Sequence, residues 1–388
     1  MRTVIVGGGV VGLLTALECV RAGHHVTVVE QGSLPNPNAA SHEPHRVLRA
    51  LHPEDPGATG AAVAAHHAWL ELETRLRVRC YHRVGALTVL PADRVAAARS
   101  VLAAAGGSGG SLGPDSLARR YRHLRFPAGH GAVFEERAGV LLADRVLAAA
   151  VRRLRAGPRT QLLAHTTVTA VNVAERAVTL ANGRVLRGDR LLVAAGAWTR
   201  PLLPAECARR LTVHRQTVLY CDVPHRDRET WARSPAMPAL GGAGGAWLVP
   251  PVAGTPLEIS AHEVTRVVAG VAGHRAAPLW VRALHERFAE LIPGFHRGWV
   301  VDARDCYYVS DAATGGPLLL DLADGEVFAD AASAGGSFKF APLTARALAT
   351  RLTGVAPPPT GLRHLDRPVR VDVPDVVAHP TDRGANPR

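Results

Sequence analysis

The sequence is short of lysine, of long apolar runs and of patterned cysteine. Lys339 is the one lysine among 45 lysines and arginines in a chain of 388 residues. An ammonium is a compact point charge and a guanidinium is a planar fork, so the two are not interchangeable at a tight site. Lys339 is therefore a candidate functional residue.

Membrane, secretory and metal-site patterns are also absent from the sequence. No apolar run is long enough to cross a membrane. The first residues already have the pattern of a buried strand, so we expect no secretory segment. The five cysteines are scattered without metal-type spacing, which argues against a metal site and a disulfide framework. We therefore predict a cytoplasmic protein without metal.

The charge balance is strongly positive, at +12. The arginines are spread along the chain, and no dense basic run is interleaved with aromatic residues, so the pattern argues against a nucleic-acid partner. An acidic partner, such as a carrier protein that presents the substrate, fits the charge through electrostatic steering. The sequence leaves monomer and homodimer open.

The N-terminus has the pattern of a dinucleotide site. An apolar strand ends at Gly7, a helix follows, and a second strand ends at Glu30. Gly7 permits a tight turn, Gly9 permits close approach to a pyrophosphate, and Gly12 lets the helix pack on the strand. Glu30 is placed to accept hydrogen bonds from a ribose. The residues expected to bind the cofactor here are Gly7, Gly9, Val10, Val11, Gly12, Glu30 and Gln31.

The order of the segments predicts two interleaved domains. We expect an α/β fold with a Rossmann-like nucleotide-binding domain and a mostly antiparallel α+β substrate domain, because short β-type runs alternate with glycine and proline over 211–270. The nucleotide-binding domain is expected at 1–80, 140–212 and 300–356, the substrate domain at 81–139 and 213–299, and a Pro-rich tail at 357–388.

Local patterns predict individual elements. Apolar residues at helical spacing predict helices at 58–78, 142–155 and 340–352. The glycines of 106–110 predict a flexible connection. From Pro357 onward, the composition predicts an extended or poorly ordered tail.

Four stretches together resemble one family of flavoenzymes. They are the N-terminal fingerprint ending in Glu30, Ser41-His42 with Arg46-Val47-Leu48-Arg49, Ala195-Gly196-Ala197-Trp198-Thr199, and Asp305-Cys306-Tyr307-Tyr308 with Ser337-Phe338-Lys339-Phe340. In this order they are similar to the FAD-dependent D-amino-acid-oxidase-like amine oxidases, in the branch of monomeric sarcosine oxidase and pipecolate oxidase. The resemblance runs from residue 3 to about 354 and implies a glutathione-reductase-type FAD-binding domain.

The resemblance implies a set of cofactor contacts. The cysteine that matches Cys306 is bonded through sulfur to the flavin 8α-methyl in this family, so we expect covalent FAD. A thiolate must attack the methyl, so Cys306 needs a polarised neighbourhood, which Arg304 or Arg46 would supply. The further residues expected at the cofactor are Ser41, His42, Arg46, Val168, Gly196, Trp198, Gly335, Gly336, Ser337, Phe338 and Lys339.

The resemblance also implies catalytic roles. Lys339 is expected beside the pyrimidine end of the flavin, where a cation stabilises reduced flavin. Arg49 is expected to hold a substrate carboxylate, and His262 to orient the amine. Glu258 falls where sarcosine oxidases place an oxygen-activating lysine, and a carboxylate there does not stabilise superoxide.

These observations predict an FAD-dependent oxidation of a C–N bond. The substrate is an amino acid or a secondary or cyclic amine with a carboxylate, hydride passes to flavin N5, an imine forms, and O2 accepts the electrons and yields H2O2. Because sarcosine-pocket tyrosines are replaced near Ala246-Trp247, sarcosine itself is not expected. Glu258 keeps open a dehydrogenase, desaturase or tailoring enzyme that uses another acceptor. An RNA-modifying flavoprotein and a redox-silent partner subunit are further alternatives.

Overall fold

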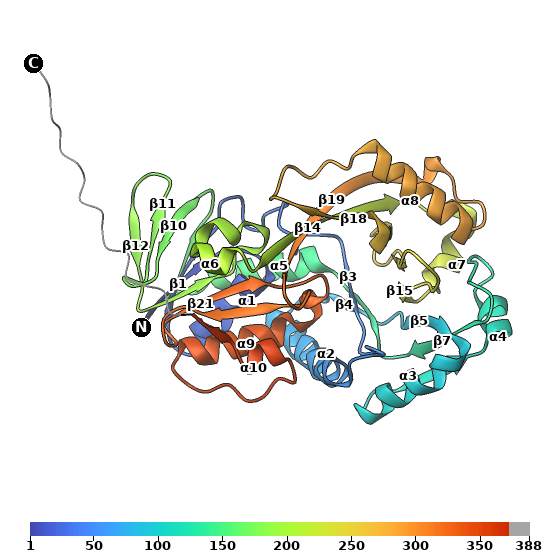
Figure 1. Cartoon of the computed structure of the whole chain (residues 1–388), viewed down its shortest axis with the longest axis horizontal. Helices are drawn as coiled ribbons and strands as arrows, with labels where there is room; N and C mark the ends of the chain where they lie inside the picture. Colours follow the sequence, from blue (N-terminus) through green and yellow to red (C-terminus); the bar gives the residue numbers. More distant parts are fainter. Residues whose placement is uncertain (372–388) are drawn as a thin grey trace, which may run out of the picture.

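The computed structural model describes residues 1–371, and segments from both ends and the middle of the chain form a seven-stranded sheet (Figure 1). The strand order is β22-β20-β21-β13-β1-β2-β9. The five strands from β21 to β9 are parallel, whereas β20 runs antiparallel to β21. The strands are β1 (Arg2–Val6), β2 (His25–Val29), β9 (Thr160–Leu163), β13 (Arg190–Val193), β20 (Leu318–Asp321), β21 (Val327–Ala332) and β22 (Val369–Arg370).

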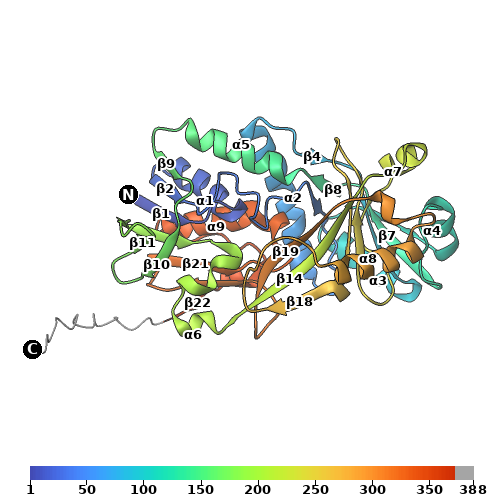
Figure 2. The same cartoon turned by 90° about the horizontal axis from the view of Figure 1, so that it is seen from above.

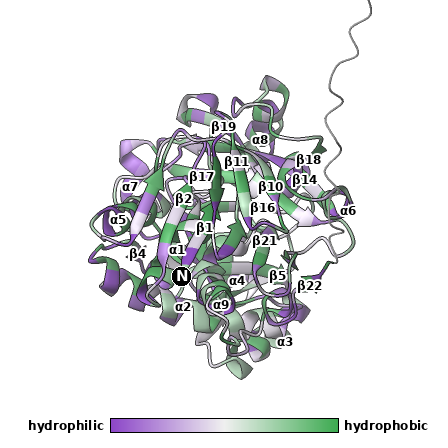
Figure 3. Ribbon diagram, turned by 90° about the vertical axis from the view of Figure 1, so that its left-hand side faces the viewer, coloured by the Kyte–Doolittle hydropathy of each residue, from purple (hydrophilic) through white to green (hydrophobic). Residues whose placement is uncertain are grey.

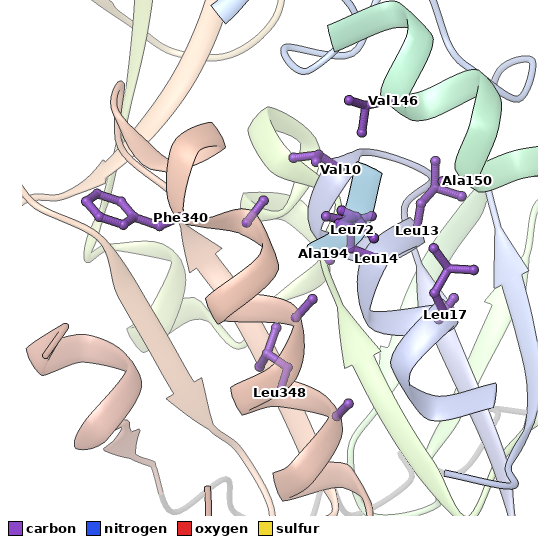
Figure 4. Close-up of a cluster of buried hydrophobic side chains, with 14 of the residues drawn as sticks. Val10, Leu13, Leu14, Leu17, Leu72, Val146, Ala150, Ala194, Phe340 and Leu348 are labelled. Carbon is purple, nitrogen blue, oxygen red and sulfur yellow. The ribbon is translucent and has the colours of Figure 1, made fainter. Parts of the chain in front are cut away.

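Helices cover one face of this sheet and pack on one another through a large apolar cluster (Figure 4). The helices are α1 (Val10–Arg21), α2 (Pro56–Leu76), α5 (Ala143–Arg155) and α9 (Ala341–Leu352). Side chains alternate along β1, so Ile5 joins the helical cluster while Val4 and Val6 join the cluster on the opposite face. The helices predicted at 58–78, 142–155 and 340–352 are confirmed as α2, α5 and α9.

The opposite face is covered by a three-stranded antiparallel meander. Its strands are β10 (Val168–Asn172), β11 (Ala177–Leu180) and β12 (Val185–Arg187). Seen from the end that carries the N-terminus, hydrophobic residues concentrate in the central strands, and hydrophilic residues lie at the rim (Figure 3).

A second, nine-stranded sheet follows the order β18-β14-β17-β16-β15-β5-β7-β6, with β19 also paired to β14. It is antiparallel except for β15 with β5. Its strands are β5 (Ala86–Pro91), β6 (Gly109–Leu112), β7 (His130–Glu135), β14 (Leu211–Cys221), β15 (Ala236–Ala239), β16 (Ala246–Val249), β17 (Leu257–Ala261), β18 (Thr265–Val268) and β19 (Val300–Asp311). The fold class expected from the sequence, a parallel nucleotide-binding sheet with a mostly antiparallel second sheet, is confirmed.

Two long paired strands connect the two sheets. β14 and β19 run side by side, as Figure 2 shows, from a cluster shared with the first sheet to the core of the second. A small third sheet consists of β3 (Arg46–Leu48), β8 (Gly139–Leu141) and β4 (Tyr81–His82). The remaining helices are α3 (Ala92–Ala104), α4 (Pro114–Arg120), α6 (Ala205–Ala208), α7 (Arg228–Ala232), α8 (Pro278–Leu291) and α10 (Arg363–Asp366).

Two local predictions are wrong. The glycine-rich connection at 106–110 enters strand β6, which pairs with β7, because glycine permits the close approach of the Phe134 backbone at Gly109. The predicted tail contains α10 and β22, because Leu362 and Leu365 are buried and Val369 pairs with Leu320. The rest of that predicted tail lies outside the described residues. Among the described residues, no helix has the length and apolarity needed to span a membrane.

Candidate active site

A cavity of about 510 Å³ lies where the first sheet meets the second. It is lined by the carboxyl ends of parallel strands on one side and by residues of β14, β16, β17 and β19 on the other. Ligands of open parallel sheets bind at this strand end. Within residues 1–371, no cluster of three histidines, cysteines or carboxylates is arranged to hold a metal ion.

The glycine turn after β1 is forced by close packing. Gly7 has a φ of +110°, and a Cβ there would lie 2.2 Å from the carbonyl oxygen of Ala194. A Cβ at Gly12 would lie 2.0 Å from the carbonyl oxygen of Gly7. No larger residue fits at either position without a backbone shift, so the turn keeps α1 tight against β1.

The N-terminus of α1 opens toward the cavity. Gly9, at the N-cap, gives the helix no side-chain cap, and Ser41 Oγ accepts a hydrogen bond of 3.1 Å from the amide of Val10. The first N–H groups of a helix and its dipole together favour an anion. This end of the cavity therefore suits a phosphate group.

Glu30 is buried at the end of β2 and is held by three donors. Its carboxylate accepts hydrogen bonds from the amide of Gly8 at 2.7 Å, the amide of Gly32 at 2.9 Å and Asn36 Nδ2 at 2.8 Å. A carboxylate has about four acceptor positions, so Glu30 retains one for a hydroxyl group in the cavity.

Cys306 lies on β19 with a carboxylate and a guanidinium beside it. The Cys306 thiol donates to Glu43 Oε1, and Arg46 Nη1 pairs with Glu43 Oε2. Arg46 also donates to the carbonyl oxygen of His45 at 2.9 Å, and its guanidinium lies 5.9 Å from the centre of the Phe338 ring. Burial first, and then Glu43, raise the pKa of the Cys306 thiol well above its ordinary value, while Arg46 opposes the rise.

Glu258 on β17 faces the cavity with His45. Glu258 Oε2 lies 2.7 Å from His45 Nδ1, and both side chains are almost fully buried. His45 Nε2 lies 3.0 Å from the carbonyl oxygen of Pro256, which can only accept, so Nε2 carries a hydrogen. The two groups are therefore within ion-pair distance at the cavity wall.

Lys339 is buried in a short 3-10 helix, Ser337–Phe340, just before α9. Its Nζ donates to His52 Nε2 at 2.9 Å, and its carbonyl oxygen accepts from Trp69 Nε1 at 2.7 Å. Burial and the charge of Arg49 lower the pKa of the Lys339 amine well below its ordinary value. Burial, Lys339 and Arg49 lower the pKa of His52 to about 2, so His52 is neutral and accepts.

Arg49 lies close to this lysine but has no anion bonded to it. Its Nη1 is buried, without a hydrogen-bond partner among the described residues. Glu135 on β7 is near enough to raise the pKa of Arg49, but burial outweighs this effect and lowers it. Glu135 Oε2 is held by the amides of Ala50 and Leu51 at 2.8 and 3.1 Å. Two buried cations therefore meet at this end, and the carboxylate beside them is bonded to the backbone.

Comparison with known proteins identifies the family of the fold that carries these residues. The profile of the family described as "FAD dependent oxidoreductase" (DAO) matches residues 2–351. The chain belongs to this family.

Its relatives are distant in sequence and similar in fold. Monomeric sarcosine oxidase of Bacillus sp. (strain B-0618) is 25% identical over 205 residues, 52% of each chain, so the chain spans about half the length of the curated relative it matches. NikD, an amino acid oxidase essential for nikkomycin biosynthesis, has a TM-score of 0.75 at 20% identity, over 92% of this chain and 96% of NikD. Amadoriase I from Aspergillus fumigatus has a TM-score of 0.75 at 16% identity, over 96% of this chain and 94% of that one.

The residues of this FAD-dependent oxidoreductase fit FAD. The glycine turn and the N-terminus of α1 would hold the pyrophosphate, and Glu30, with an acceptor position to spare, would accept from a ribose hydroxyl. Cys306 and Lys339 line the same cavity, and the flavin ring would lie in the part of the cavity next to them.

Most of the expected site residues line this one cavity. They are Gly7, Gly9, Val10, Val11, Glu30, Gln31, Ser41, Arg46, Val168, Gly196, Trp198, Glu258, Cys306, Gly335, Gly336, Ser337, Phe338 and Lys339. Four expected residues lie outside its lining. Gly12 is under the turn, Arg49 is behind Lys339, and His42 is on the loop that follows Ser41. His262 is exposed in the 3-10 helix His262–Val264, against Gly245, because that turn carries it away from the cavity.

Arg304 does not polarise Cys306. Its side chain is 42% exposed, and its Nε lies 3.5 Å from Asp302 Oδ2. Arg46 is the cation near the thiol, but Glu43 lies between them and pairs with both. The surroundings of Cys306 therefore favour the thiol, which is the opposite of the expected thiolate-favouring neighbourhood.

Sequence reasoning missed several cavity residues. Glu43 and His45 lie inside the Ser41 to Arg49 motif. Both are polar residues between positions already expected at the cofactor, and this could have marked them as cavity residues. Asn36 is bonded to Glu30. Asp330, at the end of β21, is buried and accepts from Ser333 Oγ at 2.8 Å, and burial raises its pKa to about 6.

Proposed function

We propose that this protein oxidises the C–N bond of an amino acid, or of a secondary or cyclic amine, that carries a carboxylate. The observation that supports this most directly is a pair of buried basic side chains, Lys339 in the lining of the flavin cavity and Arg49 close to Lys339. FAD supplies the acceptor for the hydride, and the substrate leaves as an imine. The family membership and the sarcosine oxidase relatives support this class of reaction.

The cation pair binds and orients the substrate carboxylate. Arg49 Nη1 has an unused donor, and Lys339 uses one of its three hydrogens on His52. A carboxylate between them restores the charged form of Lys339, because an opposite charge raises the pKa that burial has lowered. A fixed carboxylate holds the neighbouring C–H in one direction, which lowers the entropy cost of hydride transfer.

A second candidate differs in the electron acceptor. Glu258 lines the cavity close to His45, and the resemblance puts it where sarcosine oxidases carry an oxygen-activating lysine. A carboxylate at that position does not stabilise superoxide. This favours a dehydrogenase, desaturase or tailoring enzyme with another acceptor.

We also propose that Cys306 carries the flavin covalently. The thiol lines the same cavity as the glycine turn, from the β19 side. The Cys306→Ala variant should then release its flavin on acid denaturation, while the wild type retains it. Wild-type flavin that is extracted by acid would contradict the covalent link.

The function is tested by anaerobic mixing of the flavoprotein with paired amines. Each pair consists of an amino acid or cyclic amino acid and the same amine without its carboxylate. Loss of the oxidised flavin absorbance with the carboxylated member only is the expected result. If no member of a broad panel reduces the flavin, the proposal fails, and the redox-silent partner subunit becomes the better interpretation.

Admission of air then separates the two acceptors. Rapid reoxidation with one H2O2 for each flavin identifies an oxidase. Slow reoxidation, together with rapid turnover on an artificial acceptor, identifies the second candidate.

A further inference from the structure

Glu43 has an unusual place for a carboxylate. It is 8% exposed, it lines the flavin cavity, and its two oxygens face different partners. Oε2 pairs with Arg46, and Oε1 accepts from the Cys306 thiol. Arg46 is itself fixed by the carbonyl oxygens of Ala40 and His45. Glu43 is therefore held in one orientation against the sulfur.

We propose that Glu43 takes the proton of the Cys306 thiol when Cys306 bonds to FAD. This inference rests on the proposed covalent link. A thiolate is the nucleophile in sulfur chemistry, and a thiol must lose its proton as it attacks. A general base must lie within hydrogen-bonding reach of the proton it removes, and Glu43 meets this condition.

The same contact holds the thiol protonated until the flavin arrives. Burial and the Glu43 charge raise the pKa of Cys306, so the flavin-free protein holds little thiolate to be oxidised or alkylated. Arg46 compensates the charge of Glu43 and holds it in place. The carboxylate thus protects the cysteine at rest and removes its proton during the reaction.

The other polar groups near Cys306 are less suited to take its proton. Glu258 lies against His45 at 2.7 Å. Asp305, the preceding residue, points to the opposite face of β19 and is bonded to Arg215 and Arg266 as well as to Thr217. Burial and the neighbouring carboxylates raise the pKa of the Tyr220 hydroxyl, which makes it a poor source of a base.

The step balances with dioxygen as the oxidant. The S–H bond of Cys306 and one C–H bond of the flavin 8α-methyl break, and a C–S bond forms. The thiol proton passes to Glu43, the methyl proton passes to solvent, and the two electrons reduce the flavin. Dioxygen then takes two electrons and two protons and leaves as H2O2, so the cofactor returns to its oxidised form.

The test uses full-length protein from riboflavin-limited cells, mixed with FAD in air. Two rates are measured in wild type and in Glu43→Gln: attachment of flavin, from fluorescence that persists after acid denaturation, and alkylation of Cys306 by iodoacetamide without FAD, from peptide mass spectrometry. We expect Glu43→Gln to alkylate several-fold faster, because the charge that suppresses the thiolate is gone. We expect attachment to slow by about 100-fold or more, the typical effect of a lost general base.

Opposite changes in the two rates separate a proton acceptor from a residue that only sets the thiol pKa. Attachment in Glu43→Gln should rise with pH over a range where the wild-type rate is level, and Glu43→Asp should restore part of the rate. Glu71→Gln, at an exposed carboxylate that also pairs with an arginine, is the matched control. Rates are expressed per bound FAD, measured by absorbance, so a loss of cofactor binding is not mistaken for slow attachment.

Three results would overturn the proposal. If Glu43→Gln attaches flavin as fast as the wild type or faster, the carboxylate is not the acceptor. If Glu43→Gln leaves alkylation unchanged, the Glu43–Cys306 contact does not control the thiol. If the wild type attaches no flavin, the covalent link fails and the role of Glu43 fails with it, while amine oxidation by dissociable FAD remains testable.

Discussion

Lys339→Met tests whether burial lowers the pKa of the Lys339 amine in the folded protein, as the structure implies. The side chain is 6% exposed, and burial and Arg49 lower its pKa well below 10.5. Methionine has a similar length and volume, so the substitution removes the ammonium without leaving a large cavity. It also removes the donor to His52, which loses a hydrogen bond worth about 1 kcal/mol.

The pH dependence of stability has a definite sign. Between the lowered folded pKa and the ordinary unfolded one, the unfolded chain binds more protons at Lys339 than the folded chain does. The free energy of unfolding therefore rises with pH through this window, and the gain in stability is lost again as the pH falls. The slope is at most about 1.4 kcal/mol per pH unit, so wild type should gain up to about 2 kcal/mol over Lys339→Met between pH 8 and 9.5.

Urea unfolding of flavin-free protein at several pH values measures this difference. Arg346→Met, on the following helix α9, is the matched control, because Arg346 is partly exposed and pairs with Glu71. The difference between wild type and this control should stay level with pH. Parallel stability curves for wild type and Lys339→Met would show that the amine stays charged in the cavity and would refute the reasoning. The holoenzyme of Lys339→Met should also lose about 100-fold in kcat/KM on carboxylated amines.

Three further variants test other parts of the site. Glu258→Gln should speed reoxidation of reduced flavin by about tenfold in stopped-flow mixing with O2, as about 1.4 kcal/mol of repulsion is removed; an unchanged rate would mean that His45 already neutralises the carboxylate. Arg49→Ala should raise KM about 100-fold for carboxylated amines and far less for amines without a carboxylate, and equal effects would remove its assigned role. Gly12→Ala should lower unfolding free energy by more than about 3 kcal/mol and abolish FAD retention, because its Cβ would meet Gly7; wild-type flavin content after gel filtration would contradict this.

The parallel sheet and its covering helices were predictable because the sequence patterns that indicate them are local. The turn from Gly7 to Gly12 and the helical spacing in α2, α5 and α9 are each encoded within about 20 residues. The two wrong predictions involve tertiary pairing. The sequence around Gly109 predicts a flexible link, but in the structure Gly109 pairs with β7. The sequence around Leu365 predicts a tail, but in the structure Leu365 is buried. Composition alone does not report a partner strand or a buried contact.

The site was predictable where a motif fixes the position and not where distant elements meet. Lys339 was marked by its rarity and Cys306 by the resemblance. Glu135 reaches the cation pair through hydrogen bonds to Ala50 and Leu51, 84 to 85 residues away, which no spacing rule reports. Cys306 was expected beside a cation alone, because the sequence does not show that the Glu43 side chain turns toward the sulfur.

The charges of the cavity explain why the cation pair is the place to look for the substrate. Glu30 is held by N–H groups, Glu43 by Arg46 and the thiol, and Glu258 by His45. Each buried carboxylate that lines this part of the cavity therefore has its own partner. The buried Arg49 and Lys339 have Glu135 nearby, and its charge raises the pKa of both groups, but burial outweighs this effect and lowers both pKa values.

A buried charge that is incompletely compensated costs several kcal/mol, so a fold that keeps Lys339 and Arg49 together, beside a carboxylate already bonded to the backbone, gives up stability at that point. Real proteins depart from local consistency in this way chiefly where function requires it. A carboxylate on the substrate supplies the missing charge, and an amine without one leaves the cost in place. The selectivity between these two substrates should therefore track the charge at Lys339 and Arg49 more closely than the shape of the apolar walls.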